Sequence, residues 1–80
     1  MAVLTTFDTE RQIQQLLQER ESGQAEIETP AGLVDLVTDE YIIEIKHVID
    51  WTDGLKVFLF TPYLPGRKPR IHLFGVIPKT

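Results

Sequence analysis

Two runs of mostly apolar residues, Leu33–Val37 and Tyr41–His47, stand three residues apart, and this spacing constrains the fold more than any other feature of the sequence. The second run is rich in β-branched residues, which favour strands. The intervening Thr38-Asp39-Glu40 is typical of a tight turn, so the two runs are predicted to form adjacent strands. Ala25–Thr29 alternates in polarity and precedes them across a Pro-Ala-Gly turn. The three runs together predict a meander.

A helix is predicted over residues 9–22. Its apolar stripe consists of Ile13, Leu16 and Leu17. Thr9 and Gln12 are spaced as a capping box at its start, and Gly23 stands where a C-terminal cap belongs. These signals place a helix before the meander.

A second helix is predicted to begin at Trp51, after an Asp50 cap. Its apolar positions recur at helical spacing, at Trp51, Leu55, Phe58 and Leu59. Val57–Phe60 alone could also form a buried strand, but Pro62 and Pro65 end the segment at a length that suits a helix. Arg70–Ile77 is predicted to be a last buried strand. The element order is therefore α-β-β-β-α-β, an α/β fold expected to form a single domain over residues 1–80.

Composition limits the class of protein. The chain has no cysteine, which excludes disulfides and thiolate zinc sites. No apolar run approaches the roughly 20 residues of a membrane span, and Met1 to Phe7 is too short and uncharged for a signal peptide. We therefore expect a cytoplasmic protein with no membrane partner.

Charge is divided unevenly along the chain. Residues 1–45 hold ten acids and two bases, whereas residues 46–80 hold six bases and two acids, so the two parts carry net charges of −8 and +4. This asymmetry suggests a polyanionic partner on the basic side. Chance segregation of charge in a small domain is the alternative.

Acidic residues interrupt the two central strands. Asp35 lies in the middle of Leu33–Val37, and Glu44 and Lys46 share one face of Tyr41–His47 because side chains alternate along a strand. A buried carboxylate needs a partner, often a cation, and two carboxylates beside a lysine suit Mg²⁺ or Mn²⁺. The alternative is an ordinary Glu44–Lys46 pair on a half-exposed strand, with Asp35 as an acid close to a turn.

Asp35, followed after nine residues by Glu44-Ile45-Lys46, resembles the PD-(D/E)XK signature of restriction-type nucleases, and the segment is similar to small phage and cyanobacterial homing-type nucleases. The resemblance implies a minimal restriction-endonuclease-like core around a central mixed four-stranded sheet. It also implies a divalent-metal-dependent DNA endonuclease that hydrolyses phosphodiester bonds.

Carried over by position, the resemblance makes Asp35, Glu44 and the Ile45 carbonyl the metal ligands and Lys46 the catalytic lysine. Glu10 then fits the acid that such enzymes often place at the start of the first helix. Two positions depart from the pattern. Val34 replaces the proline, and Lys56 and Val57 stand where relatives often carry a glutamine.

Further residues have weaker claims to function. Phosphate contacts are predicted for the basic residues Arg67, Lys68, Arg70 and Lys56, although a basic loop that only aids solubility is the alternative. Glu26 and Glu28 are read as a solvated face in preference to outer metal ligands. His47 and His72 are read as structural, and Trp51 as a core anchor in preference to a platform for base stacking. No small-molecule cofactor is expected.

Two expectations concern the whole molecule. A non-catalytic nucleic-acid-binding or assembly module that keeps the same fold is the alternative to the nuclease. A homo-oligomer, either a dimer or a tetramer, is also expected, because the chain offers more apolar surface than one sheet face and one helix stripe can cover. The residues that carry this surplus are Phe58, Phe60, Tyr63 and Leu64.

Overall fold

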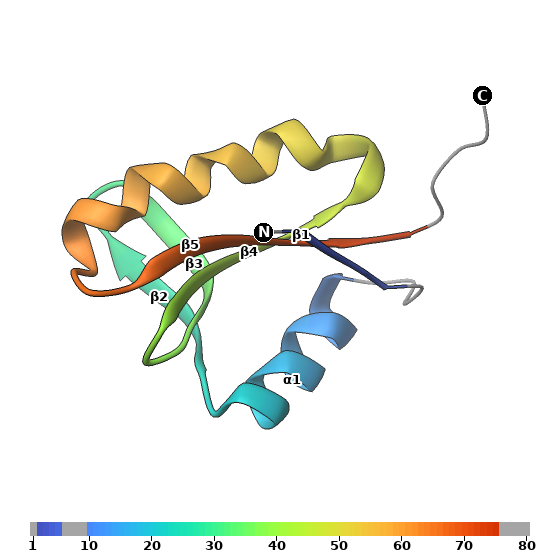
Figure 1. Ribbon diagram of the computed structural model, residues 1–80, viewed down its shortest axis with the longest axis horizontal. Helices are drawn as coiled ribbons and strands as arrows, with labels where there is room; N and C mark the ends of the chain where they lie inside the picture. Colours follow the sequence, from blue (N-terminus) through green and yellow to red (C-terminus); the bar gives the residue numbers. More distant parts are fainter. Residues whose placement is uncertain (1, 6–9, 76–80) are drawn as a thin grey trace.

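The computed structural model describes residues 2–5 and 10–75, which form a sheet with one helix on each of its faces (Figure 1). The elements along the chain are β1 (Ala2–Thr5), α1 (Glu10–Glu21), β2 (Gln24–Thr29), β3 (Gly32–Val37), β4 (Tyr41–His47), the 3₁₀ helix η1 (Val48–Tyr63) and β5 (Lys68–Phe74). The predicted α-β-β-β-α-β order is confirmed.

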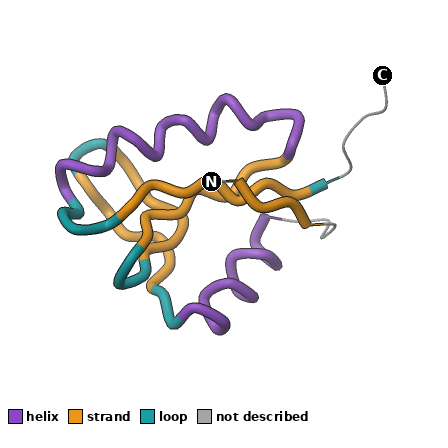
Figure 2. Tube along the Cα trace, in the orientation of Figure 1, coloured by secondary structure: helices purple, strands orange, loops and turns teal. Residues whose placement is uncertain are grey.

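The sheet is mixed and has the strand order β1-β5-β4-β3-β2. Strands β2, β3 and β4 form the predicted antiparallel meander, and η1 carries the chain over one face so that β5 pairs parallel to β4 (Figure 2). The strand β1 was not predicted. It pairs parallel with β5 at the edge and makes the sheet five-stranded in place of four. A four-residue strand whose partner lies some 70 residues away leaves no periodic signal in its own sequence.

The two faces of the sheet each carry a hydrophobic core. On the α1 side the buried residues are Ile13, Leu17, Leu36, Ile43, Ile45 and Phe74. On the η1 side they are Val34, Val37, Ile42, Val57 and Phe60. Strand β4 is buried on both faces from Ile42 to Ile45, which accounts for its nearly continuous apolar sequence.

Helix α1 ends differently from the prediction. Ser22 adopts the left-handed conformation, with φ of 54°, and the Gly23 amide donates to the Gln18 carbonyl at 3.2 Å. A side chain at Gly23 would approach Leu36 Cδ1 at 2.9 Å. Glycine is therefore required there by close packing against β3 and not by the cap itself. The predicted cap residue Thr9 lies outside the described residues.

Helix η1 begins before the predicted start. Its N-cap is His47, whose Nδ1 accepts a hydrogen bond from the Ile49 amide at 3.1 Å. Asp50 has non-helical dihedral angles, with φ of −102° and ψ of 25°, and marks a kink between two helices that together make up η1. The second of these helices therefore follows Asp50, as predicted. The residues that η1 buries are Gly54, Val57 and Phe60. Their spacing of three matches the three residues per turn of a 3₁₀ helix.

The apolar stripe predicted for this second helix was wrong. Trp51, Leu55, Phe58 and Leu59 are all exposed. Those positions were chosen for an α-helical repeat, whereas a repeat of three residues turns a different set toward the sheet. Trp51, half exposed, is accordingly not the core anchor that was expected. None of the helices in the described part of the chain is long and apolar enough to cross a bilayer.

Candidate functional site

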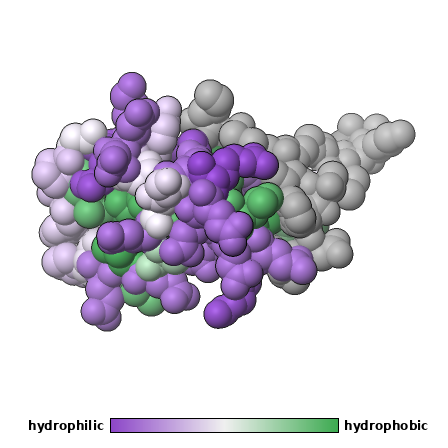
Figure 3. Space-filling model, turned by 90° about the horizontal axis from the view of Figure 1, so that it is seen from below, coloured by the Kyte–Doolittle hydropathy of each residue, from purple (hydrophilic) through white to green (hydrophobic). Residues whose placement is uncertain are grey.

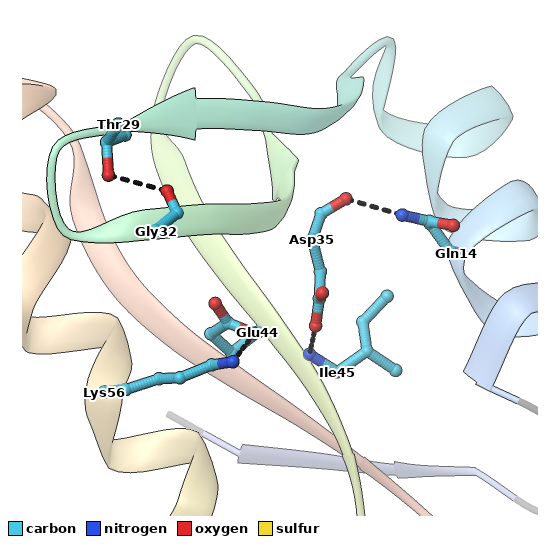
Figure 4. A network of polar contacts seen from close by, with 7 residues as sticks. All are labelled: Gln14, Thr29, Gly32, Asp35, Glu44, Ile45 and Lys56. Atoms are coloured by element: carbon cyan, nitrogen blue, oxygen red, sulfur yellow. Dashed lines mark hydrogen bonds and ion pairs between the residues drawn. The ribbon is translucent and has the colours of Figure 1, made fainter.

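The carboxylate of Asp35 takes part in the pairing of β3 with β4. These strands are in register at Leu36 with Ile43 and at Val37 with Ile42. Beyond the Leu36–Ile43 pair, toward the start of β3, the Ile45 amide donates to Asp35 Oδ2 at 2.8 Å (Figure 4). A side-chain oxygen thus replaces a strand carbonyl as the acceptor, and the carboxylate is held at the middle of the sheet.

Helix α1 fixes the backbone of the same residue. Gln14 Nε2 donates to the Asp35 carbonyl at 2.8 Å. The sequence interpretation missed Gln14, although a signal was available. Gln14 lies four residues after Glu10, and residues at that spacing share one face of an α-helix.

Glu44 is the most constrained acid in the described part of the chain. Its side chain has no exposed surface, and neither carboxyl oxygen meets a hydrogen-bond donor among the described residues. The nearest cation is Lys56 on η1, whose Nζ lies 4.0 Å from Glu44 Oε2 (Figure 4). Burial, and then the neighbouring Asp35 carboxyl, raise the pKa of Glu44 to about 9. At neutral pH Glu44 therefore holds a proton unless a cation replaces it.

Glu10 and Lys46 are the other two charged residues that were predicted to act with Asp35 and Glu44. Burial, and then the proximity of Asp35, raise the pKa of Glu10, while Lys46 acts in the opposite direction. Lys46 also lowers the pKa of Glu44. Asp35 and Lys46 thus influence the pKa of both Glu10 and Glu44, the other two side chains that were predicted as catalytic.

A cavity of about 280 Å³ adjoins Asp35. Its lining residues are Glu10, Arg11, Gln14, Glu26, Asp35 and Ile45. Glu26 has a φ of 55°, which is rare for a residue with a side chain, and it is exposed. Neither Glu44 nor Lys46 lines this cavity. Asp35 lines it and is also the neighbour of the buried Glu44.

The residue types at this site are ones that hard divalent cations prefer. Both buried oxygens of Glu44 lack a partner among the described residues, and Asp35 contributes a second carboxylate. Within residues 2–5 and 10–75 no group of three or more His, Cys, Asp or Glu side chains is arranged to hold a metal. Mg²⁺ is commonly held by one or two carboxylates, with water and phosphate oxygens filling the other positions. Asp35, Glu44 and the Ile45 carbonyl remain the predicted ligands.

The predicted phosphate-binding residues are dispersed. Arg70 pairs with Glu21 of α1, and its guanidinium lies 4.7 Å from the centre of the Tyr41 ring. Arg67 donates from Nε to the Thr38 carbonyl at 2.7 Å. Lys68 is exposed at the start of β5, and Lys56 lies over Glu44. Three of these four bases therefore make contacts within the protein, and of the four only Lys56 lies beside Glu44.

Both histidines have structural surroundings, although neither ring nitrogen of His72 has a hydrogen-bond partner among the described residues. His47 caps η1 and meets Phe74 edge to face, with 5.3 Å between ring centres. His72 is buried on β5, and burial lowers its pKa.

Comparison with known proteins finds several viral relatives. The chain is 37% identical over 68 residues to the KilA-N domain-containing protein L33 of Acanthamoeba polyphaga mimivirus, a match that covers 84% of this chain and 28% of the relative. It is 34% identical over 74 residues to the KilA-N domain-containing protein R878 of the same virus, covering 91% of this chain and 21% of the relative. The chain thus spans less than a third of the length of either relative. No family model matches it, and no solved structure matches it significantly.

These relatives correct one prediction. Membership of the PD-(D/E)XK superfamily was wrong, because the relatives are named for a KilA-N domain, which is a different domain family. The predicted signature rested on three positions, Asp35, Glu44 and Lys46, and the E-x-K part of it is common in strands. The contacts among these side chains are properties of this fold and do not depend on the superfamily.

Proposed function

We propose that this chain binds DNA, and that Asp35 and Glu44 engage the phosphate backbone through a divalent cation. The observation that carries the proposal is the Glu44 carboxyl, which is fully buried without a hydrogen-bond donor among the described residues. The names of the relatives refer to a domain and not to an enzymatic activity. The comparison therefore favours the nucleic-acid-binding or assembly alternative over catalysis.

A bound cation would compensate the cost of burying the Glu44 carboxylate without a partner. An unpaired buried carboxylate is costly, and Lys56 Nζ at 4.0 Å from Glu44 Oε2 is too distant for a hydrogen bond. A divalent ion that binds Glu44 displaces its proton, because ligands bind metal in their deprotonated form. Asp35 supplies the second carboxylate.

The same ion accounts for DNA as the partner of an acidic chain. The net charge of −4 opposes binding to a polyanion. A divalent cation at Asp35 and Glu44 would make the local charge less negative, and phosphate oxygens are ligands that Mg²⁺ accepts readily. Lys46 and Lys56 stand beside the carboxylates and add positive charge. Binding of this kind contacts the phosphate backbone of DNA and does not depend on the base sequence.

The first prediction is that DNA binding depends on metal. Fluorescence anisotropy with labelled duplex DNA should show tighter binding in Mg²⁺ than in EDTA by about 10- to 100-fold, which is the effect of one charge-assisted contact of about 1.5–3 kcal/mol. Glu44→Gln should abolish the increment. Glu28→Gln is the matched control, since Glu28 is exposed on β2 and should bind like the parent. Equal affinity in Mg²⁺ and EDTA would exclude the metal bridge.

Hydrolysis of the bound phosphodiester is the second candidate function, and the position of Lys46 favours it. Lys46 lies two residues from Glu44 on the same face of β4 and is close enough to lower the pKa of both Glu44 and Glu10. A divalent cation at such a site supplies an acidic bound water and polarises a phosphate. In this second function Lys46 would stabilise the charge that develops on the phosphate, and Glu10 would accept a proton.

The second prediction concerns this activity. Purified protein should cut single-stranded, duplex or branched DNA in Mg²⁺ or Mn²⁺ but not in EDTA. Lys46→Ala should slow the cut by about 10²- to 10³-fold, the usual effect of removing one stabilising group, with little change in metal affinity. Arg20→Ala removes an exposed base at the end of α1 that is not among the predicted phosphate contacts, and it serves as the control. Metal-dependent DNA binding without any cleavage would support the proposed DNA binding and exclude phosphodiester hydrolysis.

A further inference from the structure

We propose that the outer side of α1 contacts the DNA backbone, and that Arg11 binds one of its phosphates. This inference rests on the proposed DNA binding and extends it to a residue that was not among the predicted phosphate contacts. The contact surface consists of Arg11, Gln15 and Gln18, which we call the α1 row. Its partner is the DNA strand whose backbone is engaged at Asp35.

Arg11 is the base that lines the cavity adjoining Asp35. The cavity has a volume of about 280 Å³, and the carboxylates of Glu10, Glu26 and Asp35 line it together with Arg11. A phosphate that approaches Asp35 through this cavity therefore passes the Arg11 guanidinium. The planar fork of donors on arginine matches the oxygens of a phosphate, so Arg11 is suited to hold the strand at this point.

The Arg11 side chain is available to such a ligand. It is exposed, and within the described part of the chain it forms no hydrogen bond or ion pair, although three carboxylates line the same cavity. By contrast, Arg67 donates to the Thr38 carbonyl and Arg70 pairs with Glu21. Phosphate binding by Arg67 or Arg70 has to break a contact within the protein, whereas phosphate binding by Arg11 does not.

The α1 row continues from Arg11 along the exposed side of the helix. Arg11, Gln15 and Gln18 lie at positions i, i+4 and i+7, and all three are exposed. They lie on the side of α1 away from the buried Ile13 and Leu17, which pack on the sheet. Glutamine amides donate hydrogen bonds to phosphate and sugar oxygens, so the row offers donors and no acid to a DNA backbone.

The two sides of the molecule differ in the surface that they offer to DNA. The view from below, on the α1 side, shows a largely hydrophilic surface (Figure 3). The η1 side exposes large apolar side chains, among them Ile49, Phe58 and Leu59. Proteins contact the DNA backbone mainly by hydrogen bonds to phosphate and sugar, so the α1 side is the better match.

The third prediction is that Arg11→Ala weakens DNA binding through the loss of one phosphate contact. Fluorescence anisotropy with labelled duplex DNA in Mg²⁺ should show an affinity about 10-fold lower than that of the parent, the effect of one charge-assisted hydrogen bond. The slope of log affinity against log salt concentration should decrease by about one. Arg20→Ala is the matched control, because it removes the same charge from the last turn of the same helix, outside the α1 row, and it should bind like the parent.

The same titrations separate this inference from the proposed metal bridge. Arg11→Ala should lower the affinity by the same factor in Mg²⁺ and in EDTA, since Arg11 is not a cation ligand, whereas Glu44→Gln should abolish the difference between the two buffers. Equal affinities for Arg11→Ala and Arg20→Ala overturn the contact at Arg11 and leave DNA binding intact. A parent protein that binds no DNA overturns the proposed function and this inference together.

The rest of the α1 row is tested by adding a negative charge without changing side-chain shape. Gln15→Glu should weaken DNA binding, because it places a carboxylate beside the phosphates. Gln24→Glu is the matched control, since Gln24 is equally classed as exposed but lies on β2, and it should bind like the parent. Circular dichroism should be the same for the parent and both variants, because both side chains face solvent. Equal affinities for the two variants overturn the α1 row as the contact surface.

Discussion

Glu44 is a carboxyl group whose charge state is set by its surroundings. No part of its side chain is exposed, and the nearest positive groups, Lys56 and Lys46, lower its pKa less than burial and Asp35 raise it. The group is therefore neutral near pH 7 without a cation, and metal binding must be coupled to release of its proton.

The fourth prediction follows from the sign of this shift. The pKa of Glu44 is raised from 4.5 to about 9, so the folded state holds an extra proton between these values. The stability that this proton contributes is complete below pH 4.5 and is lost as pH rises through about 9. In EDTA the free energy of unfolding should fall with pH in this window, by at most about 1.4 kcal/mol per pH unit from this group.

Urea denaturation at a series of pH values measures this slope. Glu44→Gln keeps the shape of the side chain but cannot titrate, so its curve should be flatter than that of the parent, whereas Glu28→Gln should match the parent. The lowered pKa of His72 acts in the opposite direction, but it is common to all three proteins and cancels in the comparison. Parallel curves for Glu44→Gln and the parent would show that Glu44 titrates normally.

At the scale of the element, η1 shows how a close approach to the sheet determines which residue can occupy a position. Gly54 is buried, and a side chain there would bring its Cβ within 2.8 Å of Ile71 Cγ2 on β5. Glycine lowers helix stability, but here it lets the helix lie directly on the sheet. The same approach positions Lys56, two residues later, over Glu44.

The fifth prediction concerns this contact. Gly54→Ala should destabilise the fold by about 1–3 kcal/mol through overpacking, less the roughly 1 kcal/mol that alanine gains in helix propensity. Chemical denaturation measures the change. The exposed Thr52→Ala is the control for propensity alone and should be neutral or slightly stabilising.

A double-mutant cycle separates steric contact from other effects at Gly54. In an Ile71→Ala background the added methyl has room, so Gly54→Ala should cost less than it does in the parent. Equal costs in the two backgrounds would mean that the contact with Ile71 does not limit residue 54.

At the scale of the whole molecule, the candidate site exists only because both helices pack on the sheet. Asp35 is held from one side by Gln14 of α1, and Glu44 meets Lys56 of η1 from the other (Figure 4). The polar groups therefore span the layers shown in Figure 1. Arg70 contributes to the same architecture, because its pairing with Glu21 and its stacking on Tyr41 tie β5 to α1 and β4.

The sequence by itself determined the order of the elements after β1, the bounds of β4 and the acids at the centre of the sheet. These features depend on local periodicity and turn chemistry, which act between residues close in the chain. Asp35 and Glu44 could be paired in advance because a three-residue turn fixes neighbouring strands.

Tertiary structure alone decided the remaining features. The pairing of β1 with β5, the face that η1 turns to the sheet and the partners of Arg67 and Arg70 were all absent from the prediction. Each depends on contacts between residues far apart in sequence. The repeat of η1 changed from α-helical to 3₁₀ spacing, which reversed the inward and outward sides of its apolar residues. Local patterns record how hydrophobic a segment is, but the neighbour against which it packs decides which side is buried.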